Sequence, residues 1–231
     1  LFTDISTRRY DERMAGSMTG HMEWIRPEDI ERRSMEIIGQ EMPKGSWTPE
    51  ELAVVKRCIH TSADFDYAPN LYFSEGAISY AREALIQGAT IVTDTNMAAA
   101  GINRKALGRL GGSVRCFMAD EEVAREAAHR GITRAAVSME YAAALPGPLI
   151  FAIGNAPTAL IRLYELIREE KAAPAFIIGT PVGFVNVIEA KELIQTAGIP
   201  CIIARGRKGG SNIAAAICNA LIYQCDGSGR I

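Results

Sequence analysis

The sequence has few of the residues that build metal sites and disulfide frameworks. Only three histidines and five cysteines occur in 231 residues, and no two cysteines form a CxxC pair. An odd number of unclustered cysteines favours neither a structural zinc site nor a set of disulfides. We therefore expect no metal site and reduced cysteines, which are typical of a cytoplasmic protein.

Long hydrophobic runs are also missing. No apolar run approaches the roughly 18 residues that a membrane-spanning helix needs. Residues 1–22 lack the apolar segment of a signal peptide and show neither a helical nor a strand period. We expect them to form a loose extension, one that cloning could have added, ahead of a single domain over residues 23–231.

No excess of charge of either sign is present. The chain has 25 basic and 27 acidic residues, which gives a formal net charge of −2. A protein that binds nucleic acid through a general basic field has a clear positive excess instead. This charge balance predicts no nucleic-acid partner, and the lack of a long apolar run predicts no membrane partner.

The common nucleotide and hydrolase motifs are absent as well. The sequence contains no GxxxxGK[ST] loop and no GxGxxG after its first predicted strand. It also lacks HExxH and GxSxG, the motifs of the simplest metalloproteases and serine hydrolases. No ATP-binding or NAD-binding cofactor site is indicated.

What is present is an alternation of short apolar runs with amphipathic helices. Strands that are apolar throughout and separated by such helices are typical of a parallel sheet covered on both faces. We predict an α/β, doubly wound, mostly parallel and Rossmann-like sheet of about five strands, preceded by N-terminal helices. The predicted strands cover residues 89–94, 113–118, 148–154, 174–179 and 199–205.

Four of the loops that follow these strands combine small residues with polar or basic ones. They read TDTNMAAAGIN, GNAPT, GTPVGFVN and RGRKGGSN. In such sheets ligands bind beyond the carboxyl ends of the strands, and helix N-termini there favour anions. The sequence predicts a ligand cleft at this edge, although glycine, asparagine and threonine are also ordinary turn and capping residues.

One of the three histidines has a setting that suits chemistry. His60 ends the helical segment TPEELAVVKRCIH, in which Thr48 is the expected N-cap and Pro49 the first helical residue. Two hydroxyls and two aspartates follow it in TSADFD. A histidine can carry a proton near neutral pH, and a neighbouring carboxylate or hydroxyl can fix its tautomer. The competing interpretation is a histidine that merely caps the helix.

Several long blocks resemble the precorrin-8X methylmutase family of corrin biosynthesis, including its cobalt-precorrin-8 branch. The blocks run in order from about Trp24 to Tyr223 and are RRSMEIIGQEM, RCIHTSADFDYA, TDTNMAAAGI, FAIGNAPTAL, IIGTPVGFVNVIEAKE and ARGRKGGSNIAAAICNALIY. The resemblance implies a homodimer that moves a methyl group from C-11 to C-12 of the corrin ring, without a cofactor. It implies a corrinoid tetrapyrrole as both substrate and product, either metal-free or with cobalt.

The resemblance also assigns residues. The catalytic histidine of the family matches His60, and its substrate contacts match Ser34 and Arg57. The loops at the predicted sheet edge add further candidate substrate contacts, namely Asn96, Asn155, Thr180 and Arg205. For each of these contacts the competing interpretation is a cap or a solvated surface residue.

The role expected for His60 is that of a general acid. As an imidazolium it would protonate or hydrogen-bond the macrocycle and so localise charge for the methyl migration. Four side chains compete to orient the ring, and the sequence leaves the choice open: Thr61, Ser62, Asp64 and Asp66.

Two other functions remain open at this stage. One is a phosphate- or nucleotide-handling α/β enzyme that uses the GTPVG and GRKGGS loops. The other is a non-catalytic corrinoid-binding protein with the same fold. A bound pigment would favour either tetrapyrrole function over the nucleotide one, and turnover would separate an enzyme from a carrier.

Overall fold

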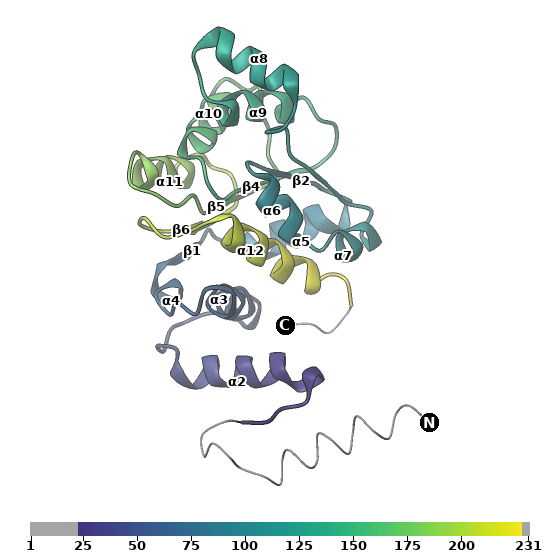
Figure 1. Ribbon diagram of the computed structural model, residues 1–231, viewed down its shortest axis with the longest axis vertical. Helices are drawn as coiled ribbons and strands as arrows, with labels where there is room; N and C mark the ends of the chain where they lie inside the picture. Colours follow the sequence, from purple (N-terminus) through teal and green to yellow (C-terminus); the bar gives the residue numbers. More distant parts are fainter. Residues whose placement is uncertain (1–22, 228–231) are drawn as a thin grey trace. The chain divides into compact units, whose positions relative to one another are not determined.

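The computed structural model describes residues 23–227 (Figure 1). The expected loose extension, residues 1–22, lies outside the described residues. The chain divides into two compact units, Leu1–Gln40 and Glu41–Ile231. The single domain expected over residues 23–231 stays a prediction.

The described part of the first unit is helical. A 3₁₀ turn, η1 (Pro27–Asp29), leads into α2 (Ile30–Glu41). Proline suits this start because its fixed φ fits the first helical turn and its missing N–H would have had no helical partner. Arg33 binds both carboxylate oxygens of Glu23, at 2.7 and 2.8 Å.

The second unit is built on a six-stranded sheet in the order β1-β6-β5-β4-β2-β3. All five predicted strands are confirmed, and they run parallel to one another. A sixth, unpredicted strand pairs antiparallel with β6 at one edge. The strands are β1 (Leu71–Phe73), β2 (Thr90–Thr93), β3 (Ser113–Arg115), β4 (Leu149–Ile153), β5 (Phe176–Gly179) and β6 (Cys201–Ala204).

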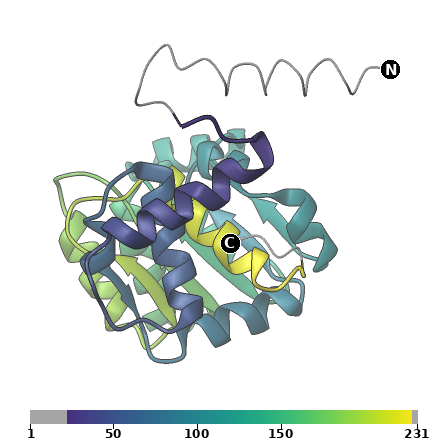
Figure 2. The same ribbon diagram turned by 90° about the horizontal axis from the view of Figure 1, so that it is seen from below.

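Helices cover both faces of this sheet, as predicted (Figure 1). On one side lie α8 (Glu121–Arg130), α9 (Arg134–Ala143), α10 (Pro157–Arg168) and α11 (Val187–Gln195). On the other lie α5 (Ala77–Ile86), α6 (Asn96–Gly101), α7 (Arg104–Arg109) and α12 (Ser211–Tyr223), with α3 (Pro49–Ser62) and α4 (Tyr67–Asn70) beyond α12. Seen from below, α12 lies in front of the strands (Figure 2).

The core explains why the central strands are apolar throughout. Every residue of β4, β5 and β6 is buried, because helices exclude water from both faces. Phe151 of β4 and Ile177 of β5 pack in one cluster with Leu163 of α10 and Ile194 of α11. Burial of such side chains is worth about 25 cal/mol per Å² and is the main force that holds the layers together.

Between β2 and β4 the order in which strands are added to the sheet reverses. From β2 the chain moves outward to β3, whereas from β4 it moves to β5 and β6 on the other side. β2 and β4 are neighbours, so the loops that leave their carboxyl ends diverge. Ligands of open α/β sheets bind in the crevice at such a switch point.

The helices themselves give one further result. No helix within residues 23–227 is long and apolar enough to cross a membrane.

Candidate functional site

A buried carboxylate joins the two loops that diverge at the switch point. Asp94 follows β2 and is 0% exposed. Its oxygens accept the backbone N–H groups of Gly154, Asn155 and Ala156 at 2.8, 2.8 and 2.6 Å. Burial raises the pKa of Asp94, while the three N–H groups act in the opposite sense. The position of Asn155 is therefore set by Asp94.

Two further links tie these loops to those after β5 and β6. Thr95 shares a 2.7 Å hydrogen bond with Ser211 at the start of α12, and it also caps α6. Thr180 accepts the N–H of Gly210 through its backbone carbonyl at 2.8 Å. The four loops predicted to lie together do so, and hydrogen bonds between them fix their shapes.

Close backbone packing explains a glycine in this region. A Cβ on Gly154 would come within 2.7 Å of the Cα of Ser211, which real Cβ atoms do not do. Glycine is therefore required where the loop after β4 meets the N-terminus of α12.

The predicted loop residues differ in what they present to a ligand. Asn96, Asn155 and Arg205 are exposed at the carboxyl edge of the sheet. Thr180 is fully buried, and its hydroxyl donates to the carbonyl of Ile153 at 3.3 Å. Three of the four side chains are thus accessible, whereas the side chain of Thr180 faces the protein.

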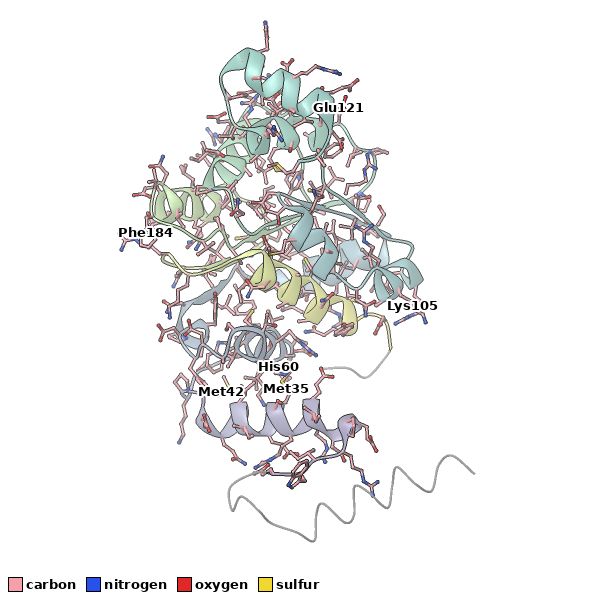
Figure 3. All side chains as sticks on the ribbon, in the orientation of Figure 1. Met35, Met42, His60, Lys105, Glu121 and Phe184 are labelled. Atoms are coloured by element: carbon pink, nitrogen blue, oxygen red, sulfur yellow. The ribbon has the colours of Figure 1, made fainter. Side chains whose placement is uncertain are left out.

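His60 lies in the last turn of α3. A capping box starts this helix: Thr48 accepts the N–H of Glu51, whose carboxylate accepts the N–H of Thr48. This confirms Thr48 as the N-cap and Pro49 as the first residue. His60 follows buried Ile59 but is itself exposed, on the side of α3 that faces away from α12 (Figure 3).

The two aspartates after His60 bind a lysine. Lys208, in the loop after β6, donates to Asp64 at 2.7 Å and to Asp66 at 2.6 Å. The hydrogen bond from Lys208 holds the pKa of Asp64 below its ordinary value. Ser62 donates to the carbonyl of Cys58 and accepts the N–H of Asp64. These bonds join the segment after His60 to the basic loop after β6.

That basic loop presents two arginines. The guanidinium of Arg205 lies over the ring of Tyr72, at 4.7 Å from its centroid, and that of Arg207 lies 5.7 Å from the centroid of Phe184. Within residues 23–227 neither arginine pairs with a carboxylate. A cavity of about 140 Å³ opens beside them, lined by Asp66, Tyr67, Asn70 and residues 205–208.

The last two predicted substrate contacts, Arg57 and Ser34, both lie on helices. Arg57 is half-buried on α3, with its guanidinium 5.5 Å from the ring centroid of Tyr223. Ser34 belongs to the first unit, where its hydroxyl donates to the carbonyl of Ile30 at 2.9 Å.

The family model of precorrin-8X methylmutase matches residues 29–224 of this sequence. The chain belongs to the precorrin-8X methylmutase family. This confirms the family expected from the quoted blocks, and with it the class of intramolecular methyl-transferring isomerases.

Relatives and a solved structure agree with this assignment. The chain is 39% identical over 202 residues to cobalt-precorrin-8 methylmutase from Priestia megaterium, with 87% of this chain and 90% of that protein covered. Identity to the Salmonella typhimurium LT2 protein of the same name is 42%, with 85% and 95% covered. A structure of precorrin-8X methylmutase from Thermus thermophilus matches with a TM-score of 0.81 at 40% identity, covering 88% of this chain and 98% of that one.

A cavity of about 430 Å³ lies elsewhere in this methylmutase chain. Residues of α8, α9 and α10 line it, and none of them is a predicted site residue. Its arginines, Arg130 and Arg162, both bind Glu140, at 2.6 and 2.7 Å. The cavity therefore offers an anionic ligand few available cations, despite its size.

Besides Asp94, the sequence interpretation missed a second buried polar residue that binds an edge loop. Lys191 of α11 is 1% exposed, and its Nζ donates to the carbonyls of Gly206 and Lys208 at 2.8 and 2.9 Å. A signal was available, because Lys191 falls on the apolar stripe of its helix with Val187, Ala190 and Ile194. A lysine in such a stripe predicts a buried ammonium with specific partners.

Proposed function

We propose that the chain moves the methyl group at C-11 of precorrin-8X, or of its cobalt form, to C-12 of the ring. The product is then hydrogenobyrinate or cobyrinate. Family membership over residues 29–224 supports this. The structural observation that carries it is an exposed imidazole joined, through the turn that follows it, to a loop with two available arginines.

His60 acts as the general acid in this proposal. A proton or hydrogen bond delivered to the conjugated macrocycle localises positive charge next to the carbon that receives the methyl group. The reaction is a rearrangement, so it needs neither a nucleophile on the protein nor an external redox cofactor. General acid help of this type is worth about 10²- to 10⁴-fold in rate.

Substrate contacts follow from the same proposal. Exposed Asn96 and Asn155 offer amide groups, and Arg57 and Arg205 offer positive charge to acetate and propionate side chains. Ser34 is a further proposed substrate contact. Thr180 contributes by holding the loop after β5 in place, because its hydroxyl, its N–H and its carbonyl all bond to other protein groups.

The first test is the variant His60→Ala with His129→Ala as its matched control. His129 is also an exposed histidine in the last turn of a helix, α8, but lies outside the predicted site. We expect the His60 variant to lose at least about 100-fold in kcat while it still binds cobyrinate, since general acid help is worth that much. The control should keep full turnover.

Turnover is followed by absorbance, because the methyl shift changes the conjugation of the macrocycle. Metal-free and cobalt-loaded substrates are supplied in separate reactions. The one that is converted shows whether the enzyme acts on precorrin-8X or on its cobalt form. Full conversion by the His60 variant would remove this residue from the chemistry. Tight binding of cobyrinate without any turnover by the wild type would favour a carrier instead, a function for which the comparisons give no support.

The proposal also covers the assembly, the location and the partner of the protein. The protein works as a homodimer, as the resemblance implies. It acts in the cytoplasm, where its five free thiols stay reduced. Its partner is the corrinoid, and the near-neutral charge of the chain gives no support for nucleic acid.

A further inference from the structure

The loop after β6 is held from several sides by bonds to its backbone carbonyls. Lys191 binds those of Gly206 and Lys208, and the N–H of Gly183 binds that of Arg207 at 3.2 Å. The Tyr67 hydroxyl donates to the carbonyl of Gly209 at 3.4 Å. All four successive carbonyls, residues 206–209, therefore point into the protein.

This backbone arrangement has an electrostatic consequence. A carbonyl oxygen is the negative end of the peptide dipole, and here these ends are turned away from solvent. The side chains of Arg205, Arg207 and Lys208 are exposed instead. The outer surface of the loop thus keeps positive charge without nearby carbonyl oxygens to oppose an anion.

The three cations of the loop do not have the same role. Lys208 is occupied by Asp64 and Asp66 and serves to attach the loop to the turn after His60. Arg205 and Arg207 rest on aromatic rings, which orient a guanidinium without neutralising it. They are therefore the two groups of the loop ready to pair with a carboxylate.

Burying the ammonium of Lys191 costs folding free energy. It is buried without a carboxylate partner among residues 23–227, and burying an ammonium is expensive unless it is well bonded. An apolar side chain at this position would continue the stripe of α11 at lower cost. What the lysine provides is a bond to two carbonyls of one loop, and those bonds fix where Arg205 and Arg207 lie.

We propose that Lys191 is a positioning residue, which holds residues 205–209 so that Arg205 and Arg207 form a subsite for a carboxylate side chain of the substrate. The inference rests on the proposed function for the identity of the substrate. It adds a residue outside the cleft and a role for the arginine pair. Because Asp64 and Asp66 bind the same loop, the subsite is placed in register with the segment that carries His60.

The test combines Lys191→Met, the double variant Arg205→Gln/Arg207→Gln, and Lys105→Met as control. Lys105 is an exposed lysine of α7, and it projects in the opposite direction to Phe184 (Figure 3). Each variant is titrated with cobyrinate and with the same macrocycle carrying amides in place of carboxylates. We expect both test variants to bind cobyrinate about tenfold more weakly, to bind the amide form as the wild type does, and to show a raised KM with kcat within about threefold.

Hydrogen exchange of the loop separates the two roles. The N–H of Gly183 bonds to the carbonyl of Arg207 within the loop, and the N–H of Gly210 bonds to Thr180 next to it. Both N–H groups should exchange faster in Lys191→Met. The double arginine variant should leave these exchange rates unchanged, because it alters only exposed side chains. The control should match the wild type in every measurement.

Each result bears on one statement. Wild-type affinity for cobyrinate in the double variant would overturn the subsite, whether or not Lys191→Met folds. Unchanged exchange in a folded Lys191→Met would overturn the positioning role. Failure of the wild type to bind or convert any corrinoid would instead remove the proposed function, and the exchange data would still decide whether Lys191 holds the loop.

Discussion

At the scale of single residues, two polar groups inside this protein hold the loops at the carboxyl edge of the sheet. Asp94 and Lys191 are both fully buried, and each binds the backbone of a loop rather than a side chain of opposite charge. Such groups are costly to bury, so they persist where their bonds fix a particular geometry. Here that geometry is the carboxyl edge of the sheet.

The burial of Lys191 predicts a dependence of stability on pH. Burial lowers the pKa of Lys191 from its ordinary 10.5 to about 8. Between these two values the unfolded chain binds a proton that the folded protein does not, so the free energy of unfolding rises with pH. Below pH 8 the penalty of burying the ammonium is present in full.

Urea denaturation at pH 7.5 and pH 9.5 measures this effect. Relative to Lys191→Met, the wild type should gain about 2 kcal/mol of stability between these two pH values, out of the roughly 3 kcal/mol that complete titration gives. The two carbonyls can still accept bonds from the neutral amine, so the loop itself should hold. A difference between the two proteins that stays constant with pH would contradict the depressed pKa.

The sequence could not reveal which polar side chains the protein uses internally. The motif around Thr180 pointed to a ligand, yet its hydroxyl bonds to Ile153. Asp64 and Asp66 follow His60 so closely that they were candidates to orient its ring, yet both bind Lys208, more than 140 residues away in the chain. Proximity in sequence says little about a pairing that the topology of the sheet decides.

At the scale of elements, the predictions from periodicity held for the long segments. Each of the five apolar runs became a strand, with ends that moved by at most three residues. The strand missed was β1, which has only three residues, Leu71–Phe73, and follows directly on α4. A segment so short shows no period, and only its pairing with β6 makes it a strand.

The helix that carries His60 gives a prediction at this scale. Its capping box satisfies two N–H groups that the first turn would otherwise leave without partners. Thr48→Ala should therefore lower the free energy of unfolding by about 1 kcal/mol. Chemical denaturation measures the change, with the exposed substitution Thr61→Ala in the same helix as control.

Thr48→Ala should affect kcat much less than it affects stability. The cap lies more than two helical turns from His60, so kcat at a temperature where the variant is folded should change less than twofold. A large loss of kcat with an unchanged free energy of unfolding would show that the start of α3 takes part in the site directly.

At the scale of the whole molecule, the fold brings four loops from distant parts of the sequence to one edge. The order of the strands does this, because parallel strands with crossover helices end on the same side. Family resemblance supplied the chemistry that these loops serve, since neither composition nor spacing identifies a tetrapyrrole. The residues that bond these loops to one another, such as Asp94, could be identified only from the structure.

The proposed homodimer is testable at this scale. Light scattering on the purified protein should give a mass close to twice that of one chain. Because association stabilises the folded state by mass action, Tm should rise with protein concentration. A monomeric mass together with full turnover would show that the site is complete in one chain.

The two outer strands of the sheet limit how copies of this chain can meet. β1 and β3 each have three residues, and β3 exposes both Ser113 and Arg115. Short edge strands are poor templates for pairing with a strand of another molecule, and the polar side chains of β3 weaken its edge further. Aggregation by edge-to-edge pairing is thereby discouraged, and β6, which leads into the arginine loop, stays protected behind β1. Two copies are therefore expected to associate through helices or loops rather than by joining their sheets into one.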